Sequence, residues 1–192
     1  MSNTQGKYKP FVLWFTGLSG AGKSTLSNKI YDYLKLNHIK VELLDGDIVR
    51  HILPNIGFTK EERDNHIKRI GFLTSMLEKN DITVIASFIS PYKEARDFVR
   101  GLCSNFTEVY VKASLKACEC RDVKGLYKKA RTGQIQHFTG ISDPYEEPQS
   151  PELVIETDKQ SVEESFLILK NYVDQHLINN ELKLKEQHGK VG

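Results

Sequence analysis

The sequence is poor in cysteine and has no long apolar run. It contains three cysteines, Cys103, Cys118 and Cys120, and no pair of them has the C-x-x-C spacing typical of a zinc site. We therefore expect reduced thiols in a reducing compartment. No segment approaches the roughly 20 apolar residues that span a bilayer, and residues 1–10 lack the apolar core of a targeting signal. These absences predict a cytoplasmic protein without a membrane partner.

The chain also lacks a strong excess of either charge. Its 27 basic and 25 acidic side chains leave a formal net charge of +2, so the composition does not indicate a nucleic-acid partner. With 39% hydrophobic residues in 192, one core can form without disulfides or a structural metal. We predict one domain over residues 1–178 and a charged, disordered tail over residues 179–192.

One motif with a defined chemistry is present near the N-terminus. Residues 17–24 match the phosphate-binding pattern G-x-x-x-x-G-K-[ST] at every required position. An apolar segment over residues 11–15 predicts a buried strand before it, and an amphipathic helical pattern follows. Such a loop points N–H groups at phosphates, so Lys23 is expected at the β- and γ-phosphates of ATP and the Ser24 hydroxyl on Mg²⁺. The predicted ATP-binding residues are Gly17, Leu18, Ser19, Gly20, Ala21, Gly22, Lys23, Ser24 and Thr25.

Two carboxylates follow the second predicted strand, residues 41–44. Because the carboxyl ends of strands form the ligand edge of an open α/β sheet, Asp45 and Asp47 are predicted to lie in the site. Asp47 is placed to take a proton from an attacking hydroxyl or to hold magnesium, and Arg50 to bind an anionic substrate. A solvated Asp-Gly turn is the alternative. The third predicted strand ends without an acidic residue, which leaves the metal to these two carboxylates.

A helix is predicted from Thr59 to about residue 79. Thr59 and Glu62 have the spacing of a capping box. Arg63 and His66 are three residues apart and share one face, which either reaches the site or is solvated. The predicted apolar stripe consists of Ile67, Ile70, Leu73 or Thr74, and Leu77.

Two later segments carry further candidate residues. A helix over residues 91–102 is predicted to have Ser90 as its N-cap and Pro91 at its first position. Lys124, Lys128 and Arg131 have the spacing of one helix face, which predicts a basic lid over about residues 122–150 that closes on phosphates. A merely solvated basic face is the alternative.

Strand patterns alternate with helical patterns along the chain, which is typical of a parallel sheet covered by helices. We predict an α/β, three-layer fold of the P-loop NTPase type, with a mainly parallel five-stranded sheet flanked by helices and a basic lid. Ser114 is predicted to cap a short helix, and Ser161 with Glu164 to open the last helix. The predicted strands are residues 11–15, 41–44, 82–87, 109–113 and 153–157.

Several separated segments together resemble the adenylylsulfate kinases, a family that phosphorylates the 3′-hydroxyl of adenosine 5′-phosphosulfate with ATP in sulfate assimilation. The resemblance covers roughly residues 11–155 and is much more specific than the phosphate loop alone. The segments that carry it are residues 17–24, 45–50, 57–58, 63–70, 87–91, 121–131 and 138–141.

The resemblance implies a role for each matching residue. Asp47 matches the carboxylate near the 3′-hydroxyl and the metal, Phe58 and Phe138 match a pair that sandwiches the adenine, and Ser90 matches a serine described as a phosphorylated intermediate. Direct in-line attack does not need that intermediate. The resemblance also implies ATP and Mg²⁺ as cofactors and allows a homodimer. The implied catalytic residues are Asp47, Lys23, Ser90 and Lys124, and the implied metal ligands are Ser24 and Asp47. The implied substrate-binding residues are Asp45, Asp47, Arg50, Phe58, Arg63, His66, Ile89, Ser90, Lys124 and Phe138.

The sequence departs from the family pattern at one substrate position. The family's run D-R-x-x-N-I-R-R has an asparagine where this chain has His66, and Glu62 and Lys68 replace its first Asp and one Arg. Asparagine offers a donor and an acceptor together, whereas neutral histidine offers them on separate ring nitrogens. Another 5′-substituted nucleotide is therefore an alternative acceptor, and a non-catalytic ATP-binding regulatory module is an alternative function.

Overall fold

The computed structural model describes residues 8–52 and 57–178, and its five strands form one sheet. Every pair of neighbouring strands is parallel, in the order β2-β3-β1-β4-β5. The strands are β1 Val12–Thr16, β2 Val41–Asp45, β3 Thr83–Ser87, β4 Phe106–Lys112 and β5 Leu153–Glu156. The predicted parallel sheet of five strands is confirmed. The predicted tail lies outside the described residues, and the bounds of the domain stay a prediction.

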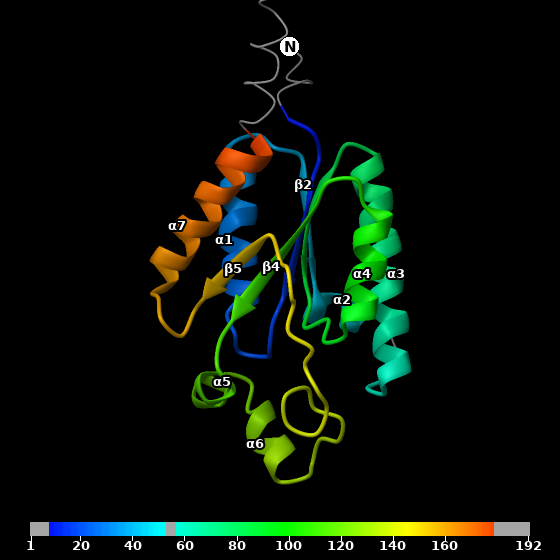
Figure 1. Cartoon of the computed structure of the whole chain (residues 1–192), viewed down its shortest axis with the longest axis vertical. Helices are drawn as coiled ribbons and strands as arrows, with labels where there is room; N and C mark the ends of the chain where they lie inside the picture. The colour runs from blue at the N-terminus through cyan, green and yellow to red at the C-terminus, as the bar shows by residue number, and fades with distance from the viewer. Residues whose placement is uncertain (1–7, 53–56, 179–192) are drawn as a thin grey trace, which may run out of the picture.

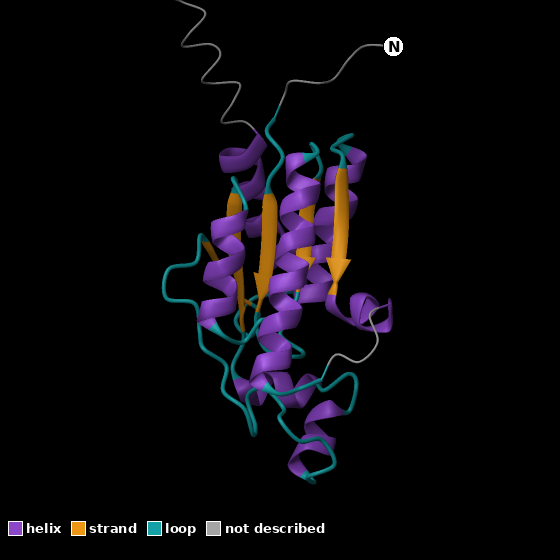
Figure 2. Ribbon diagram, turned by 90° about the vertical axis from the view of Figure 1, so that its right-hand side faces the viewer, coloured by secondary structure: helices purple, strands orange, loops and turns teal. Residues whose placement is uncertain are grey.

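Helices cover both faces of the sheet and gather at one end of it. In Figure 1, α1 and α7 lie on one face and α3 and α4 on the other. The strand arrows in Figure 2 point toward the end where α5, α6 and the following loop lie. Within the described part of the chain, none of these helices combines the length and apolar character that a bilayer crossing needs. The helices are α1 Lys23–Leu36, α2 Gly46–Ile52, α3 Lys60–Lys79, α4 Lys93–Leu102, α5 Leu115–Arg121, α6 Leu126–Arg131, α7 Val162–Tyr172 and the π-helical η1 Val173–Ile178.

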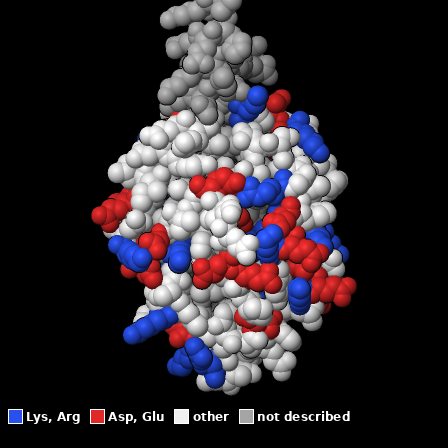
Figure 3. Space-filling model, viewed as in Figure 1, with Lys and Arg blue, Asp and Glu red and all other residues white. Residues whose placement is uncertain are grey.

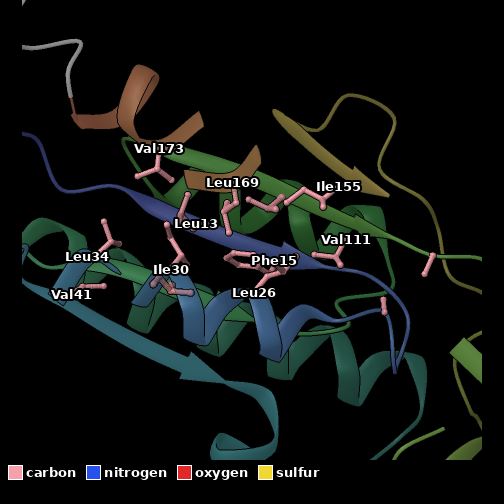
Figure 4. Packing of buried hydrophobic residues seen from close by; sticks show 14 of the residues in the cluster. Leu13, Phe15, Leu26, Ile30, Leu34, Val41, Val111, Ile155, Leu169 and Val173 are labelled. Atoms are coloured by element: carbon pink, nitrogen blue, oxygen red, sulfur yellow. The ribbon is translucent and has the colours of Figure 1, made fainter. Parts of the chain in front are cut away.

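The central strand β1 is buried along its whole length. Figure 4 shows Leu13 and Phe15 among Leu26 and Ile30 of α1 and Leu169 of α7. The alternate residues of β1 point to the opposite face and join a second cluster with α3 and α4, because successive side chains of a strand face opposite sides. Because both faces of the strand are buried, residues 11–15 are all apolar rather than alternately apolar and polar. The phosphate loop is therefore attached to a rigid strand.

Three of the predicted helix caps are confirmed. Thr59 and Glu62 bond each other's backbone N–H groups at the start of α3, and Ser161 and Glu164 do the same at the start of α7. Ser114 accepts a hydrogen bond from the Ala117 N–H at the start of α5. A side-chain cap of this kind is formed within four residues of sequence, which is why the pattern alone predicts it.

The prediction that Ser90 caps α4 is wrong. The helix begins at Lys93 after Tyr92, and Pro91 lies outside it. The Lys93 N–H instead donates to the Glu146 carboxylate at 2.7 Å, so a distant loop supplies the cap. Ser90 itself has a left-handed φ of 39°, a conformation incompatible with the extended backbone of an N-cap residue.

One further detail of the helices differs from the prediction, and another decides between two predicted alternatives. Gly125, with φ 65°, precedes α6, so Lys124 lies outside that helix and does not share a face with Lys128 and Arg131. Arg131 pairs with Glu119 on α5 instead. On α3 the apolar stripe passes through the buried Thr74, whereas Leu73 is 41% exposed.

Candidate active site

The phosphate loop connects β1 to α1 and lies at the carboxyl edge of the sheet. A Cβ atom at Gly17 would lie 2.4 Å from the carbonyl oxygen of Val111 on the neighbouring strand, so only glycine fits. Gly22, with φ 103°, precedes α1 and supplies no side-chain cap. The first N–H groups of α1 therefore have no side-chain cap competing for them, which is the arrangement that binds phosphate at a helix N-terminus.

Lys23 is turned into its own loop. Its Nζ donates to the carbonyl oxygens of Gly17 at 3.0 Å and Leu18 at 2.9 Å. Only 9% of the residue is exposed, and this burial lowers the pKa of Lys23 to about 8. A buried ammonium gains strongly from an anionic partner, so a phosphate in the loop would favour the charged form.

Ser24 and the carboxylates after β2 meet beside the loop. The Ser24 hydroxyl donates to Asp45 Oδ2 at 3.0 Å, and Asp45 Oδ1 accepts the N–H of Asp47 at 2.9 Å. Asp45 is buried, whereas the side chain of Asp47 is 65% exposed and contacts Lys124 Nζ. The structure thus brings Asp45 to Ser24 and leaves Asp47 facing the open side of the site.

The oxygen atoms of this cluster fit a magnesium ion. Hydroxyl and carboxylate oxygens are the ligands that Mg²⁺ prefers, together with water and substrate phosphates. The described residues contain no group of three or more His, Cys, Asp or Glu side chains that could hold a metal ion. A cation beside Ser24 would therefore need phosphate and water oxygens to complete its octahedral shell, which is how Mg²⁺ usually binds with a nucleotide.

The segment of α5 and α6 is attached to the phosphate loop. The Tyr127 hydroxyl donates to the Ser19 carbonyl at 2.9 Å. Arg121 donates to the Gly20 carbonyl at 3.3 Å and to Thr157 after β5. Sequence reasoning singled out the basic residues of this segment but missed Arg121, Tyr127 and Thr157 as contacts of the loop. Arg121 and Tyr127 lie within residues 121–131, a segment that carried the family resemblance, which was the available signal.

Arg63 is buried in the site rather than solvated. Its guanidinium donates to the Thr139 hydroxyl and to the His137 carbonyl, and it lies 3.7 Å from the Asp143 carboxylate. The alternative that this face of α3 is solvated is therefore wrong. Arg63 instead connects α3 to the turn over residues 137–143 and fixes that turn over the site.

His66 is buried one turn further along α3. It is 4% exposed, and neither ring nitrogen has a hydrogen-bond partner in the described part of the chain. Its ring lies edge-on to Phe88 at 5.9 Å. Burial, aided by the charges of Arg50 and Arg69, lowers the pKa of His66 to about 4. The imidazole is therefore neutral near pH 7 and has one donor and one acceptor to offer.

Ile89 and Ser90 lie at the end of β3 and are held from several sides. The Ser90 hydroxyl accepts the Trp14 indole N–H at 3.1 Å and is 1% exposed. Arg96 donates to the Ser90 carbonyl at 2.7 Å. The chain that leads to both residues runs beside the carboxylates, because Ser87 pairs with Asp45 and the Phe88 ring lies against Gly46.

The two candidate adenine partners have different surroundings. Phe58 is 52% exposed and lies under the guanidinium of Arg50, 4.8 Å from its ring centre. Phe138 is 9% exposed, and its ring meets Tyr127 edge-on at 5.0 Å. Phe58 therefore offers a free aromatic surface, whereas Phe138 is largely packed. Their pairing around one base stays a prediction.

The strand order and the site together define a class of protein. A phosphate loop follows the central strand β1, and the carboxylates Asp45 and Asp47 lie at the last residue of the edge strand β2 and two residues beyond it. On the face drawn in Figure 3, basic and acidic side chains are interspersed rather than gathered by sign. These features are those of a P-loop kinase, in which the phosphates lie at the N-terminus of α1 and the acceptor lies beside the carboxylates.

Comparison with known proteins identifies the family. Residues 9–156 match the profile of the adenylylsulphate kinases. The adenylyl-sulfate kinase of Halothermothrix orenii is 52% identical over 168 residues, covering 87% of this chain and 91% of that protein. The structure of the Mycobacterium tuberculosis APS kinase in complex with AMPPNP and APS superposes with a TM-score of 0.82 at 34% identity, covering 88% of this chain and 99% of that one. A hexameric APS kinase from Thiobacillus denitrificans gives a TM-score of 0.66 at 32% identity, covering 88% of this chain and 29% of that one.

The chain belongs to the adenylylsulphate kinase family. Its relatives are ATP-dependent kinases, which confirms the prediction of a P-loop phosphotransferase.

Proposed function

We propose that this protein transfers the γ-phosphoryl group of ATP to the 3′-hydroxyl of adenosine 5′-phosphosulfate, giving 3′-phosphoadenosine 5′-phosphosulfate and ADP in sulfate assimilation. The observation that carries the proposal is the contact of Asp47 with Lys124 beside the phosphate loop. This contact brings together a carboxylate and an ammonium from distant segments. It lies at the edge of the sheet where the γ-phosphate of ATP bound in the loop would lie. A nucleotide-binding regulatory module has no need of such a pair.

The proposed step is an in-line displacement at phosphorus. The 3′-oxygen of the acceptor forms a bond to the γ-phosphorus while the bond to the β,γ-bridging oxygen breaks, and ADP leaves. Asp47 takes the hydroxyl proton, and Lys23 and Lys124 stabilise the charge on the transferred group. When bound, Mg²⁺ neutralises charge on the β- and γ-phosphates. Ser24 and Asp47 are its proposed ligands, with Asp45 orienting the Ser24 hydroxyl.

Direct transfer is favoured over a phosphoserine intermediate. Ser90 is buried, and its hydroxyl already accepts a hydrogen bond from Trp14. A nucleophilic serine needs an adjacent base that accepts its proton. Among the described residues, the side chains that bond Ser90 are the Trp14 indole, which donates to its hydroxyl, and the Arg96 guanidinium, which donates to its carbonyl. Both are donors. We therefore assign Ser90 to holding the acceptor through its segment.

The acceptor is proposed to lie between the carboxylate segment and the turn over residues 137–143. Arg50 and Arg63 supply positive charge for the phosphosulfate group, and Phe58 supplies a surface for the adenine. His66 replaces the family's asparagine as a neutral donor and acceptor. Ile89 and Phe138 complete the apolar part of this pocket.

The first experiment is an assay of the purified protein with ATP, Mg²⁺ and adenosine 5′-phosphosulfate. Mass spectrometry should detect an acceptor that has gained one phosphoryl group at its 3′ position, together with ADP. Turnover of another 5′-substituted nucleotide, with none of adenosine 5′-phosphosulfate, would contradict the acceptor assignment. ATP binding without acceptor-dependent ADP release would contradict the kinase assignment.

We also propose a cytoplasmic location, because the three cysteines are free thiols and such thiols persist in a reducing compartment. Cell fractionation with an antibody against the chain tests this proposal. Recovery in a secreted or periplasmic fraction would overturn it.

We propose a homodimer formed through the exposed face of α3 and α4. Phe72, Met76 and Phe98 are 60%, 48% and 45% exposed on this face, beside a hollow of about 510 Å³. Lys68 on α3 and Glu94 on α4 border the apolar residues. These two side chains pair with each other at 3.7 Å within the chain, and a two-fold axis would bring the same apolar residues of a second copy against this face. One APS kinase similar to this chain is hexameric.

The oligomeric state tests this face directly. Light scattering after size exclusion should give a dimer for the wild type and a monomer for Phe72→Asp. Leu36→Asp changes a residue of α1 that is 79% exposed and serves as the matched control. A monomeric wild type, or a Phe72→Asp protein that remains dimeric, would rule out this interface.

A further inference from the structure

Two hydroxyl groups, that of the buried Thr16 and that of the half-buried Tyr145, connect three segments around the phosphate loop. Thr16 is the last residue of β1, is 0% exposed and immediately precedes Gly17. Its Oγ1 lies 2.7 Å from the Ile89 carbonyl oxygen and 2.9 Å from the Tyr145 hydroxyl. One side chain therefore joins the strand before the phosphate loop, the segment after β3 and the loop after α6.

The chemistry of these groups fixes the direction of both hydrogen bonds. A carbonyl oxygen only accepts, so the single hydroxyl hydrogen of Thr16 is donated to Ile89. Thr16 then has only lone pairs left for Tyr145, which must be the donor. Burial raises the pKa of Tyr145, so its proton remains available over the whole range in which an enzyme works. We call the Tyr145-to-Thr16-to-Ile89 chain the hydroxyl relay.

The segment reached by the relay adjoins the carboxylates after β2. A Cβ at Gly46 would lie 3.1 Å from the Phe88 ring and 3.2 Å from the Ser87 carbonyl oxygen. The segment also contains a strained residue, because Ser90 has a φ of 39°. Such backbone persists only where its surroundings hold it. Movement of Ile89 would therefore shift the Asp45–Asp47 segment against the phosphate loop.

The other end of the relay is firmly anchored. The Tyr145 ring stacks on Tyr110 at 6.1 Å. The neighbouring Glu146 donates its N–H to the Pro91 carbonyl at 2.8 Å and accepts from Arg96 at its own carbonyl at 2.7 Å. These contacts hold the Tyr145 hydroxyl at a defined place relative to Ile89 and Ser90, so the relay acts as a fixed spacer rather than as a loose surface contact.

We propose that Tyr145 and Thr16 are positioning residues whose hydroxyl relay sets the spacing between the phosphate loop and the acceptor-side segment over residues 87–90. The inference rests on the proposed phosphoryl transfer, in which the donor phosphorus and the acceptor oxygen must be in line. Small errors in such an alignment lower the rate much more than they lower the binding of either substrate.

Tyr145→Phe is the sharpest test, because it removes the hydroxyl and keeps the stacked ring. We expect kcat to fall about tenfold, while KM for ATP and the midpoint of thermal unfolding stay close to wild type. Tyr110→Phe removes a hydroxyl from the ring stacked on Tyr145 and should keep wild-type kcat. Thr16→Val should lower kcat at least as far as Tyr145→Phe, and Thr16→Ser, which keeps the hydroxyl, should restore most of it.

The effects of Tyr145→Phe and Thr16→Val on kcat should also be non-additive. Because Tyr145 and Thr16 belong to one relay, the Tyr145→Phe/Thr16→Val protein should be little slower than Thr16→Val alone. Wild-type kcat in a folded Tyr145→Phe protein would overturn the proposal. A lower kcat accompanied by higher KM values for both substrates and a lower unfolding midpoint would also overturn it, because that result indicates general loss of structure. If the wild type instead phosphorylates another 5′-substituted nucleotide and not adenosine 5′-phosphosulfate, the proposed acceptor is wrong, and the same variants test the relay with that nucleotide as the acceptor.

Discussion

The proposed donor side and the proposed acceptor side of the site are built in different ways. The donor side consists of consecutive residues between β1 and α1, and its lysine bonds carbonyls five and six residues away. The acceptor side is assembled from α2, α3, the end of β3 and the segment after α5, joined by Lys124 to Asp47 and by Arg63 to the turn over residues 137–143.

This difference has consequences for sequence, stability and response to mutation. A donor site formed by one short segment is recognisable from its pattern and survives changes elsewhere in the fold. An acceptor site formed by four segments depends on ion pairs and buried polar groups that each have a distant partner. Mutations on the donor side should therefore remove catalysis outright, whereas those on the acceptor side should change affinity, acceptor choice and pH dependence.

The largest effect is expected from Lys23→Ala on the donor side. The change removes the ammonium, which now bonds the Gly17 and Leu18 carbonyls and would bond the phosphates of ATP instead. Loss of such a charge-stabilising group lowers kcat by about a thousandfold. Steady-state kinetics measures it. Lys29→Ala, which removes an exposed partner of Glu163, is the control and should retain activity. A comparable loss in both proteins would contradict the assignment.

Asp47→Asn should give the next largest effect. It tests the comparison where the two sides meet, because Asp47 lies between the phosphate loop and the acceptor. The amide cannot accept the hydroxyl proton, so we expect kcat to fall about a hundredfold. The affinity for ATP, measured by calorimetry without Mg²⁺, should remain near wild type because the phosphate loop is intact. Asp32→Asn alters an exposed carboxylate of α1 and should be neutral. Near-normal turnover of Asp47→Asn would exclude Asp47 as the base.

Arg63→Lys tests an acceptor-side connection. Lysine keeps the charge but cannot bond Thr139 and His137 together, and loss of a charge-assisted bond in a buried site corresponds to about thirtyfold in kcat/KM for adenosine 5′-phosphosulfate. The expected signature is a raised KM for the acceptor with an unchanged KM for ATP. Equal changes in the KM for ATP and the KM for the acceptor would show that Arg63 affects both sides of the site.

The smallest effect concerns pH and His66. Its pKa is about 4 in the folded protein against an ordinary value of 6.5, so the unfolded chain binds more protons between these values and stability falls as the pH is lowered. Between pH 7.5 and pH 5.5 the contribution of His66 to the free energy of unfolding should fall by about 1 kcal/mol. Urea unfolding at the two pH values measures it.

His66→Asn, which has no titrating ring, is the matched variant for that measurement. Between pH 7.5 and pH 5.5 its free energy of unfolding should fall by about 1 kcal/mol less than that of the wild type. Identical pH dependence in the two proteins would show that the buried imidazole is not the group responsible.

Much of the fold could be predicted from the sequence because its signals are local. The apolar run before Gly17, the glycine pattern and the Thr59/Glu62 and Ser161/Glu164 capping boxes each act within a few residues. Such features depend on backbone geometry and short-range hydrogen bonds, which the neighbouring residues alone decide. The phosphate-loop pattern between β1 and α1 could be recognised for the same reason.

Only the tertiary structure decided how the acceptor half is connected. Glu146 caps α4 from 53 residues away, which releases Ser90 from the capping role that its position beside Pro91 suggests. Gly125 separates Lys124 from α6, so the spacing of the basic residues does not put them on one face. Thr16 and Tyr145 are 129 residues apart, and no pattern in either segment indicates the other. The sequence by itself determined the elements and the phosphate loop, whereas long-range hydrogen bonds and burial determined which side chains meet, because these energies exist only once the chain has packed.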